Sequence, residues 1–133
     1  MTNSEEYVKG LKVVICGGRD FFNYEVVKNV LERCKFKEDT VIISGHANGA
    51  DKLGERYAKE KGLQLDIHPA NWGKYGMSAG PIRNQEMCDI CNCVVAFWDG
   101  VSRGTKNMIN ISNKAGHKVL VFDYKGNLVQ IYN

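Results

Sequence analysis

The sequence predicts an α/β fold, in which helices cover both faces of a doubly wound, mainly parallel sheet of about five strands with a short C-terminal strand at one edge. Short apolar runs alternate with amphipathic stretches along the chain, which is the pattern of repeated strand–helix–strand units. Several of the runs are apolar throughout instead of at every second residue, as expected of strands covered on both faces. Right-handed connections then wind these strands into one sheet.

The apolar runs define six strands. They are expected at residues 12–16, 40–44, 63–68, 93–98, 118–122 and 128–132. Lys125, Gly126 and Asn127 form the expected turn into the last strand. That strand is therefore expected to cover one edge of the sheet.

Four helices are expected between the strands, and each has a signal at one end. Asn23 can cap the first helix, and Asp51 can cap the second, which Gly62 ends. Pro81 suits the first turn of the third helix, and Gly116 ends the fourth. The apolar residues expected to face inward are Val26, Val27, Val30 and Leu31, then Leu53, Tyr57 and Ala58, then Met87 and Ile90, and finally Met108, Ile109 and Ile111.

Length and composition indicate one soluble domain. The chain has 133 residues, of which 44% are hydrophobic, which predicts a single domain over residues 1–133. The N-terminal residues lack the features of a secretion signal, and no apolar run approaches the length of a membrane span, so we expect a cytoplasmic protein. The net charge of +3 is too small to indicate nucleic-acid binding by itself, but it suits an anionic ligand.

The five cysteines are expected to be reduced thiols, because the chain has no export signal. Cys88, Cys91 and Cys93 are closely spaced. No second pair of cysteines or histidines at zinc spacing completes a metal site with them. We therefore expect no metal and no cofactor.

Four glycine-rich segments follow predicted strands. They lie at residues 17–20, 44–51, 80–84 and 99–105. The carboxyl ends of parallel strands gather at one edge of a sheet, so these segments should line a single crevice. Glycines and helix starts offer backbone N–H groups to a ligand. Arg19, Arg83 and Arg103 lie within or beside the segments, and guanidinium groups match phosphate oxygens, so we expect an anion site.

Residues 69–79 connect a strand to a helix and are too long and glycine-rich for a minimal connection, which suggests a lid or binding loop. Trp72 or Tyr75 can stack on a base, or Trp72 can simply anchor the loop. His46 can donate to phosphate or form a hydrogen bond that orders its own loop.

Ser44 and Ser102 are expected to donate hydroxyl hydrogen bonds to phosphate. A nucleophilic role is not expected, because the glycine-x-serine-x-glycine pattern and the ordered acid and histidine are absent. The Walker phosphate loop is also missing after the first strand, so ATP hydrolysis is not expected.

Together the segments resemble the YspA-like branch of the SLOG superfamily. The motifs are Gly-Gly-Arg-Asp at residues 17–20, Ser-Gly-x-Ala-x-Gly-Ala-Asp at 44–51, Gly-Pro-Ile-Arg-Asn-x-x-Met at 80–87 and Trp-Asp-Gly-x-Ser-x-Gly-Thr at 98–105. The resemblance spans residues 12–122. It implies a Rossmann-like fold and a nucleotide or nucleotide-derived ligand.

Arg83-Asn84-Gln85-Glu86-Met87 and Gly104-Thr105 also look like motifs of the lonely-guy phosphoribohydrolases, which cleave the base from a nucleoside monophosphate. The resemblance implies that Arg83 holds the sugar phosphate and that Gly104 and Thr105 cradle phosphate. Where that family has its catalytic glutamate, three residues after Thr105, this chain has Met108. Methionine cannot stabilise the positive charge that develops on the sugar when an N-glycosidic bond is cleaved.

Other carboxylates near the expected crevice can take over this role. Asp99, at a strand end beside Gly100, is the first candidate for contacting the ribose or activating water, and Glu86 is the second. Asp51 is expected to be a helix cap, and Asp20 to pair with a loop arginine or hold its turn.

A third resemblance is to the DNA-processing protein A family, whose Rossmann-like core binds single-stranded DNA. The similar motifs are residues 44–51 and Arg83-Asn84. Binding a strand without sequence preference requires a long basic groove with aromatic platforms, and this chain has a modest charge. DNA binding is therefore the less favoured alternative.

The sequence thus predicts that a nucleotide binds at the carboxyl edge of the sheet, with or without hydrolysis of its N-glycosidic bond. The alternatives are a non-catalytic sensor or sequestering module, and single-stranded DNA binding. A homodimer is expected because small domains gain from burying an apolar helix face. The residues expected to bind the ligand are Gly17, Gly18, Arg19, Ser44, Gly45, His46, Ala47, Gly49, Asp51, Trp72, Arg83, Asn84, Asp99, Gly100, Ser102, Gly104 and Thr105.

Overall fold

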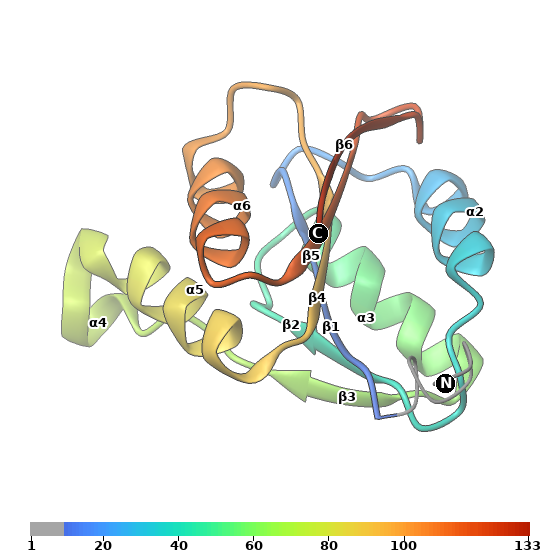
Figure 1. Cartoon of the computed structure of the whole chain (residues 1–133). Coiled ribbons are helices and arrows are strands. Elements are labelled where there is room, and N and C mark those ends of the chain that lie inside the picture. Colours follow the sequence, from blue (N-terminus) through green and yellow to red (C-terminus); the bar gives the residue numbers. More distant parts are fainter. Residues whose placement is uncertain (1–9) are drawn as a thin grey trace.

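The computed structural model describes residues 10–133, in which six strands form one sheet in the order β3-β2-β1-β4-β5-β6. Five strands are parallel: β1 (Lys12–Gly17), β2 (Val41–Ser44), β3 (Gln64–Ile67), β4 (Cys93–Phe97) and β5 (Lys118–Phe122). Strand β6 (Leu128–Tyr132) runs antiparallel to β5 at one edge (Figure 1). The predicted fold class is confirmed.

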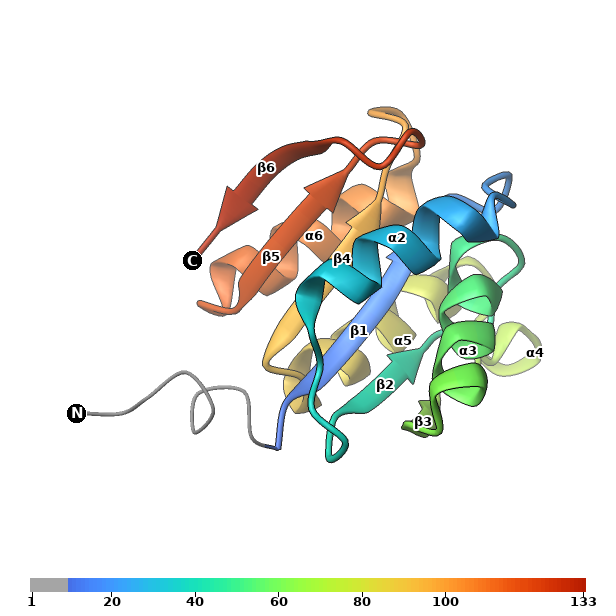
Figure 2. The same cartoon turned by 90° about the vertical axis from the view of Figure 1, so that its right-hand side faces the viewer.

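Helices lie on both faces of the sheet (Figures 1 and 2). Helices α2 (Tyr24–Cys34) and α3 (Ala50–Lys61) cover one face, and α5 (Ala79–Ile90) and α6 (Arg103–Lys114) cover the other.

Strand β1 shows why both faces need cover. Val13 and Ile15 pack in the cluster that includes residues of α2 and α3, whereas Val14 and Cys16 pack in the cluster that includes residues of α5 and α6. Successive side chains of a strand point to opposite faces, so a strand buried on both sides is apolar at every position.

Most of the predicted helix ends are confirmed. The Asn23 side chain caps α2 by accepting a hydrogen bond from Val26 N at 3.3 Å. Gly62 ends α3 in the left-handed conformation, with φ of 67°, and Pro81 lies in the first turn of α5. Gly116 follows the end of α6, with φ of 85°.

Two expectations for the helices are wrong. The residue that precedes α3 is Gly49, and Asp51 is the second residue of the helix instead of its cap. Its carboxylate accepts from Ala47 N, one turn outside the helix. Ile90, expected to face inward, is 36% exposed because it lies in the last turn of α5, beyond the buried Met87 and Cys88.

Residues 69–79, expected to be a lid or binding loop, contain two short helical segments. They contain the short helix α4 (Trp72–Tyr75), which is capped by the Asn71 side chain, and a 3₁₀ helix, η1 (Gly76–Ser78). The next glycine-rich segment, residues 80–84, forms the first turns of α5, as the position of Pro81 predicts. No helix in residues 10–133 combines the length and the apolar character that crossing a membrane requires.

All five cysteines are free thiols. Cys16, Cys88, Cys91 and Cys93 are buried and Cys34 is partly exposed. Within residues 10–133, no group of three or more His, Cys, Asp or Glu side chains is arranged to hold a metal ion.

Candidate functional site

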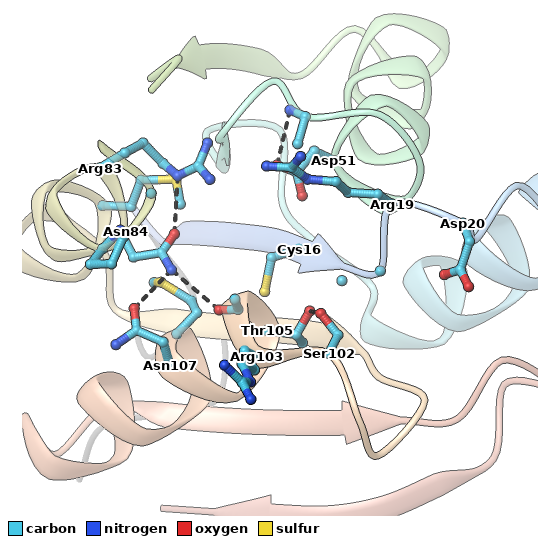
Figure 3. Close-up of a pocket in the computed structure, with 18 of the residues that line it drawn as sticks. Cys16, Arg19, Asp20, Asp51, Arg83, Asn84, Ser102, Arg103, Thr105 and Asn107 are labelled. Carbon is cyan, nitrogen blue, oxygen red and sulfur yellow. Dashed lines mark hydrogen bonds between the residues drawn. The ribbon is translucent and has the colours of Figure 1, made fainter. Parts of the chain in front are cut away.

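The strand order reverses between β1 and β4, and a pocket of about 740 Å³ opens there at the carboxyl ends of the strands (Figure 3). A smaller hollow of about 240 Å³ adjoins it. Four residues line both hollows: Arg19, Ala47, Trp72 and Arg83. The structure therefore brings together the segments after β1, β2 and β4 and the start of α5.

Two close backbone contacts explain why glycines stand beside this pocket. Ala50 N at the start of α3 donates to Gly18 O at 3.1 Å, so the loop after β1 lies directly on the helix start. A Cβ atom on Gly49 would stand 2.3 Å from Gly18 O, and Gly49 has φ of 81°. A Cβ on Gly17 would stand 2.3 Å from Phe97 O of β4. Both positions require glycine so that the loops can pack.

Arg83 is held in place at the boundary of the two hollows. Its Nη1 donates to Gly45 O at 2.6 Å and its Nε donates to Asn84 Oδ1 at 3.0 Å. The Asn84 nitrogen in turn donates to Gly104 O at 3.2 Å and to Asn107 Oδ1 at 2.9 Å, which joins α5 to α6 (Figure 3). Two of the five guanidinium N–H groups are used, and the other three have no partner among residues 10–133.

Arg19 and Trp72 form the facing part of the boundary. The Arg19 guanidinium lies over the Trp72 ring, 5.5 Å from its centroid. The Trp72 side chain is 49% exposed and lines both hollows. An aromatic residue that only anchored its loop would be buried, so Trp72 has a free ring surface at the pocket.

Asp51 lies deep in the pocket and is only 5% exposed. Ala47 N donates to its Oδ2 at 3.2 Å. Burial raises the pKa of the Asp51 carboxyl to about 6, although the Ala47 N–H group and the guanidinium groups of Arg83 and Arg19 lower it. Cys16 lies beside it on β1, and its pKa is raised by burial and by the Asp51 charge.

Asp99 also lines the pocket, but part of its carboxylate is engaged. Val101 N and Ser102 N donate to its Oδ1 at 2.9 and 2.8 Å, and these bonds lower the pKa of Asp99. Asp99 thus holds the loop before α6. Glu86, the second carboxylate considered from the sequence, is exposed on α5 and is not among the residues that line the two hollows.

The sequence is similar to two sets of known proteins. A model of the YspA, cpYpsA-related SLOG family matches residues 11–75. The Gene 61 protein of Mycobacterium phage D29 is 32% identical over 125 residues, which is 86% of this chain and 98% of that protein. The chain belongs to the YspA, cpYpsA-related SLOG family.

Two solved structures of DNA processing protein A share the fold of this SLOG protein. The Streptococcus pneumoniae protein aligns with a TM-score of 0.69 at 16% identity over 86% of this chain. The Helicobacter pylori protein, described for its single-stranded DNA binding mode, aligns with a TM-score of 0.61 at 18% identity over 90% of this chain. The chain spans 50% of the Streptococcus protein and 68% of the Helicobacter protein.

The loop after β2 in this SLOG protein is ordered by a buried cluster that includes a residue missed from the sequence. Glu55 is 4% exposed, and its Oε2 accepts from Ser44 Oγ at 2.7 Å and contacts His46 Nδ1 at 2.8 Å. Lys52 Nζ contacts the other ring nitrogen of His46 at 3.0 Å. Glu55 lies four residues after Asp51 and therefore on the same face of α3, and from this spacing its place near the loop could have been predicted.

This cluster changes the interpretation of two residues. The Ser44 side chain is completely buried and lies outside the lining of both hollows, so it holds the loop instead of facing the pocket. His46 forms the loop-ordering hydrogen bond that was one of its two interpretations, and it also lines the smaller hollow.

Among the remaining predicted residues, Gly17, Gly18 and Gly104 line the pocket and Gly45 lines the smaller hollow. Ser102 and Thr105 line the pocket at the start of α6, with their hydroxyl oxygens 3.2 Å apart. Gly49 and Gly100 lie outside the lining of both hollows. Asp20 accepts from the Tyr124 hydroxyl at 2.7 Å instead of pairing with an arginine. The residues that line the larger pocket and are not among those expected to bind the ligand are Cys16, Asp20, Met77, Gly80, Pro81, Met87, Arg103, Asn107 and Met108.

Proposed function

We propose that this protein binds a nucleotide or a nucleotide-derived ligand at the boundary of the two hollows. The observation that supports this most strongly is the placement of Arg19, Arg83 and the exposed Trp72 ring around one boundary. Guanidinium groups suit phosphate, and an aromatic face suits a base. The larger hollow, at about 740 Å³, lies within the usual volume range of small-molecule sites.

The chemistry of the lining suggests how the ligand is oriented. The smaller hollow is lined by Arg19, Arg83 and His46 and suits a phosphate group. The base then stacks on Trp72. The start of α6, with Gly104 and Thr105, offers a second set of donors to an anion in the larger hollow.

Cleavage of the N-glycosidic bond is a separate step of this proposal, and Asp99 is the residue that would support it. Met108 lines the pocket and is 1% exposed, so it cannot supply the carboxylate that such a reaction needs. Asp99→Asn should abolish release of the free base while sparing binding. Glu86→Gln is the matched control, because Glu86 lies outside the lining. Turnover that survives Asp99→Asn contradicts this assignment.

Single-stranded DNA binding is the second candidate. The fold shared with DNA processing protein A, one structure of which is described for its single-stranded DNA binding mode, favours it. A DNA-binding protein would bind longer oligonucleotides more tightly than mononucleotides, with an affinity that falls steeply as salt increases. A nucleotide-binding protein would gain little from length.

Thermal unfolding with a ligand panel tests the proposal. The panel contains nucleoside monophosphates, ADP-ribose, NAD, cyclic nucleotides and short single-stranded DNA. A ligand at about a hundred times its Kd adds roughly 2.7 kcal/mol of stability, which raises the Tm by several degrees in a domain of this size.

Two variants locate the binding site. Arg83→Ala should lose the ligand-induced increase in Tm. Lys106→Ala, which removes the same charge from an exposed residue outside both linings, should keep it. No increase with any nucleotide, or an increase that Arg83→Ala retains, contradicts the proposal.

A further inference from the structure

Asp51 occupies an unusual position for a carboxylate, because it lies beside the two arginines that suit an anionic ligand. Arg83 Nη1 and Asp51 Oδ2 stand 2.5 and 2.9 Å from the position that a Cβ atom on Gly45 would take. The Arg83 guanidinium and the Asp51 carboxylate thus both lie close to Gly45, where the absence of a side chain leaves room for them. Figure 3 shows the Arg19 and Arg83 side chains extending from different segments toward this region.

The Asp51 carboxylate is nevertheless not neutralised by direct contact. Among residues 10–133, Asp51 forms no ion pair within 4.0 Å, and its one side-chain hydrogen bond is accepted by Oδ2 from Ala47 N. Arg83 gives two of its N–H groups to Gly45 and Asn84. The other carboxylate oxygen of Asp51 therefore has no donor among residues 10–133, and it is not one of the fully buried atoms without a partner, so it is open to the pocket.

The charges that face Asp51 come from several elements. Arg83 on α5 and Arg19 after β1 favour its ionised form, whereas Glu55, on its own helix, disfavours it. Cys16 on β1 stays a neutral thiol, because burial moves its pKa further above physiological pH. The other titratable groups that line the two hollows are His46, Asp20, Asp99 and Arg103.

We propose that Asp51 is the proton-carrying member of an anion site on the side of the larger hollow, which Arg19, Arg83 and Asp51 all line. When Arg83 and Arg19 hold an anionic group there, the Asp51 carboxyl takes up a proton and donates a hydrogen bond to that group. This inference rests on the proposed function. A bound anion neutralises the arginines that favour ionised Asp51 and places negative charge beside it, and both effects favour the protonated form. The second oxygen of Asp51 then gains a partner that residues 10–133 do not provide.

The consequence is that anion binding is tighter in mild acid. The pKa of free Asp51 is about 6. If a bound anion raises this pKa by about one unit, binding becomes about sevenfold tighter at pH 5.5 than at pH 8.0. Sulfate is the suitable probe, because it mimics phosphate and does not itself change protonation over this range.

The experiment is to measure the Kd of sulfate by calorimetry at pH 5.5, 6.5 and 8.0 and constant ionic strength. The wild-type protein should bind several-fold more tightly at pH 5.5. Asp51→Asn should bind with an affinity that does not change with pH, because the amide keeps a hydrogen-bond donor and cannot titrate. His46→Gln is the control, because His46 lines the smaller hollow together with Arg19 and Arg83.

The outcomes separate this inference from the function it rests on. Sulfate binding that does not depend on pH leaves the anion site intact and overturns the role of Asp51. A pH dependence that persists in Asp51→Asn and vanishes in His46→Gln assigns the proton to His46 and overturns it as well. No sulfate binding at any pH contradicts the anion site itself. In the wild-type chain, ¹³C NMR should show the pKa of Asp51 rising when sulfate binds, and an unchanged pKa overturns the inference without any substitution.

Discussion

Replacing Asn84 tests the arrangement of the site most sharply, because this side chain joins α5 to α6 and holds Arg83. Its oxygen accepts from Arg83 Nε at 3.0 Å, and its nitrogen donates to Gly104 O at 3.2 Å and to Asn107 Oδ1 at 2.9 Å. Asn84→Ala removes all three bonds at a side chain that is 7% exposed. At about 1 kcal/mol for each bond, the free energy of unfolding should fall by about 3 kcal/mol.

Asn107→Ala is the matched control for this variant. It removes only one of the three bonds and should cost about 1 kcal/mol. Urea unfolding followed by circular dichroism gives both values, and the Tm of Asn84→Ala should fall by about 10 °C. An Asn84→Ala variant as stable as Asn107→Ala would refute the reasoning, because the network would then not hold the two helices together.

Three further predictions concern the described core and pocket. Gly49→Ala should lower the free energy of unfolding in urea by more than about 2 kcal/mol, because its Cβ would meet Gly18 O at 2.3 Å. Gly62→Ala, also at positive φ but in open space, should lower it by about 1 kcal/mol, and equal losses would show that the close contact is unimportant. The raised pKa of Asp51 stabilises the fold below about pH 4, and this contribution is lost as the pH rises through about 6. In the same assay Asp51→Asn should therefore gain about 2.4 kcal/mol over wild type between pH 4 and pH 7.5, and a constant difference would contradict the pKa. Iodoacetamide should modify Cys34 first, as mass spectrometry can show, because the other four thiols are buried; earlier modification of any of those would contradict the packing.

The sequence was sufficient for the fold because the apolar runs and helix ends are local signals. Strand β5 (Lys118–Phe122) has the predicted ends, and Asn23 caps α2 as expected. The signal at Asp51 was misleading, since an aspartate near a helix start is usually a cap. Gly49 precedes α3 instead, so the helix starts two residues earlier than a cap at Asp51 would place it, and Asp51 lines the pocket.

The site was predicted at the level of segments but not of every side chain. Arg19, Arg83 and Trp72 meet at one boundary, as segments that follow parallel strands should. The burial of Ser44 was not predictable, because it depends on Glu55, a partner eleven residues away on another element. The short helix α4, which presents Trp72, is held by the Asn71 cap, a signal that was present but was not used.

The most direct test of the central claim is to locate the bound nucleotide by ¹⁵N–¹H NMR of the labelled protein. The most stabilising nucleotide of the panel is added, and the backbone amides whose shifts change are mapped. We predict that they cluster at residues 17–19, 45–51, 83–84 and 102–105, around the two adjoining hollows. A second groove of about 900 Å³, lined by Val30, Phe36 and Leu120 among others, lies elsewhere on the molecule. Shift changes centred on that groove, with the arginine boundary unaffected, would contradict the account.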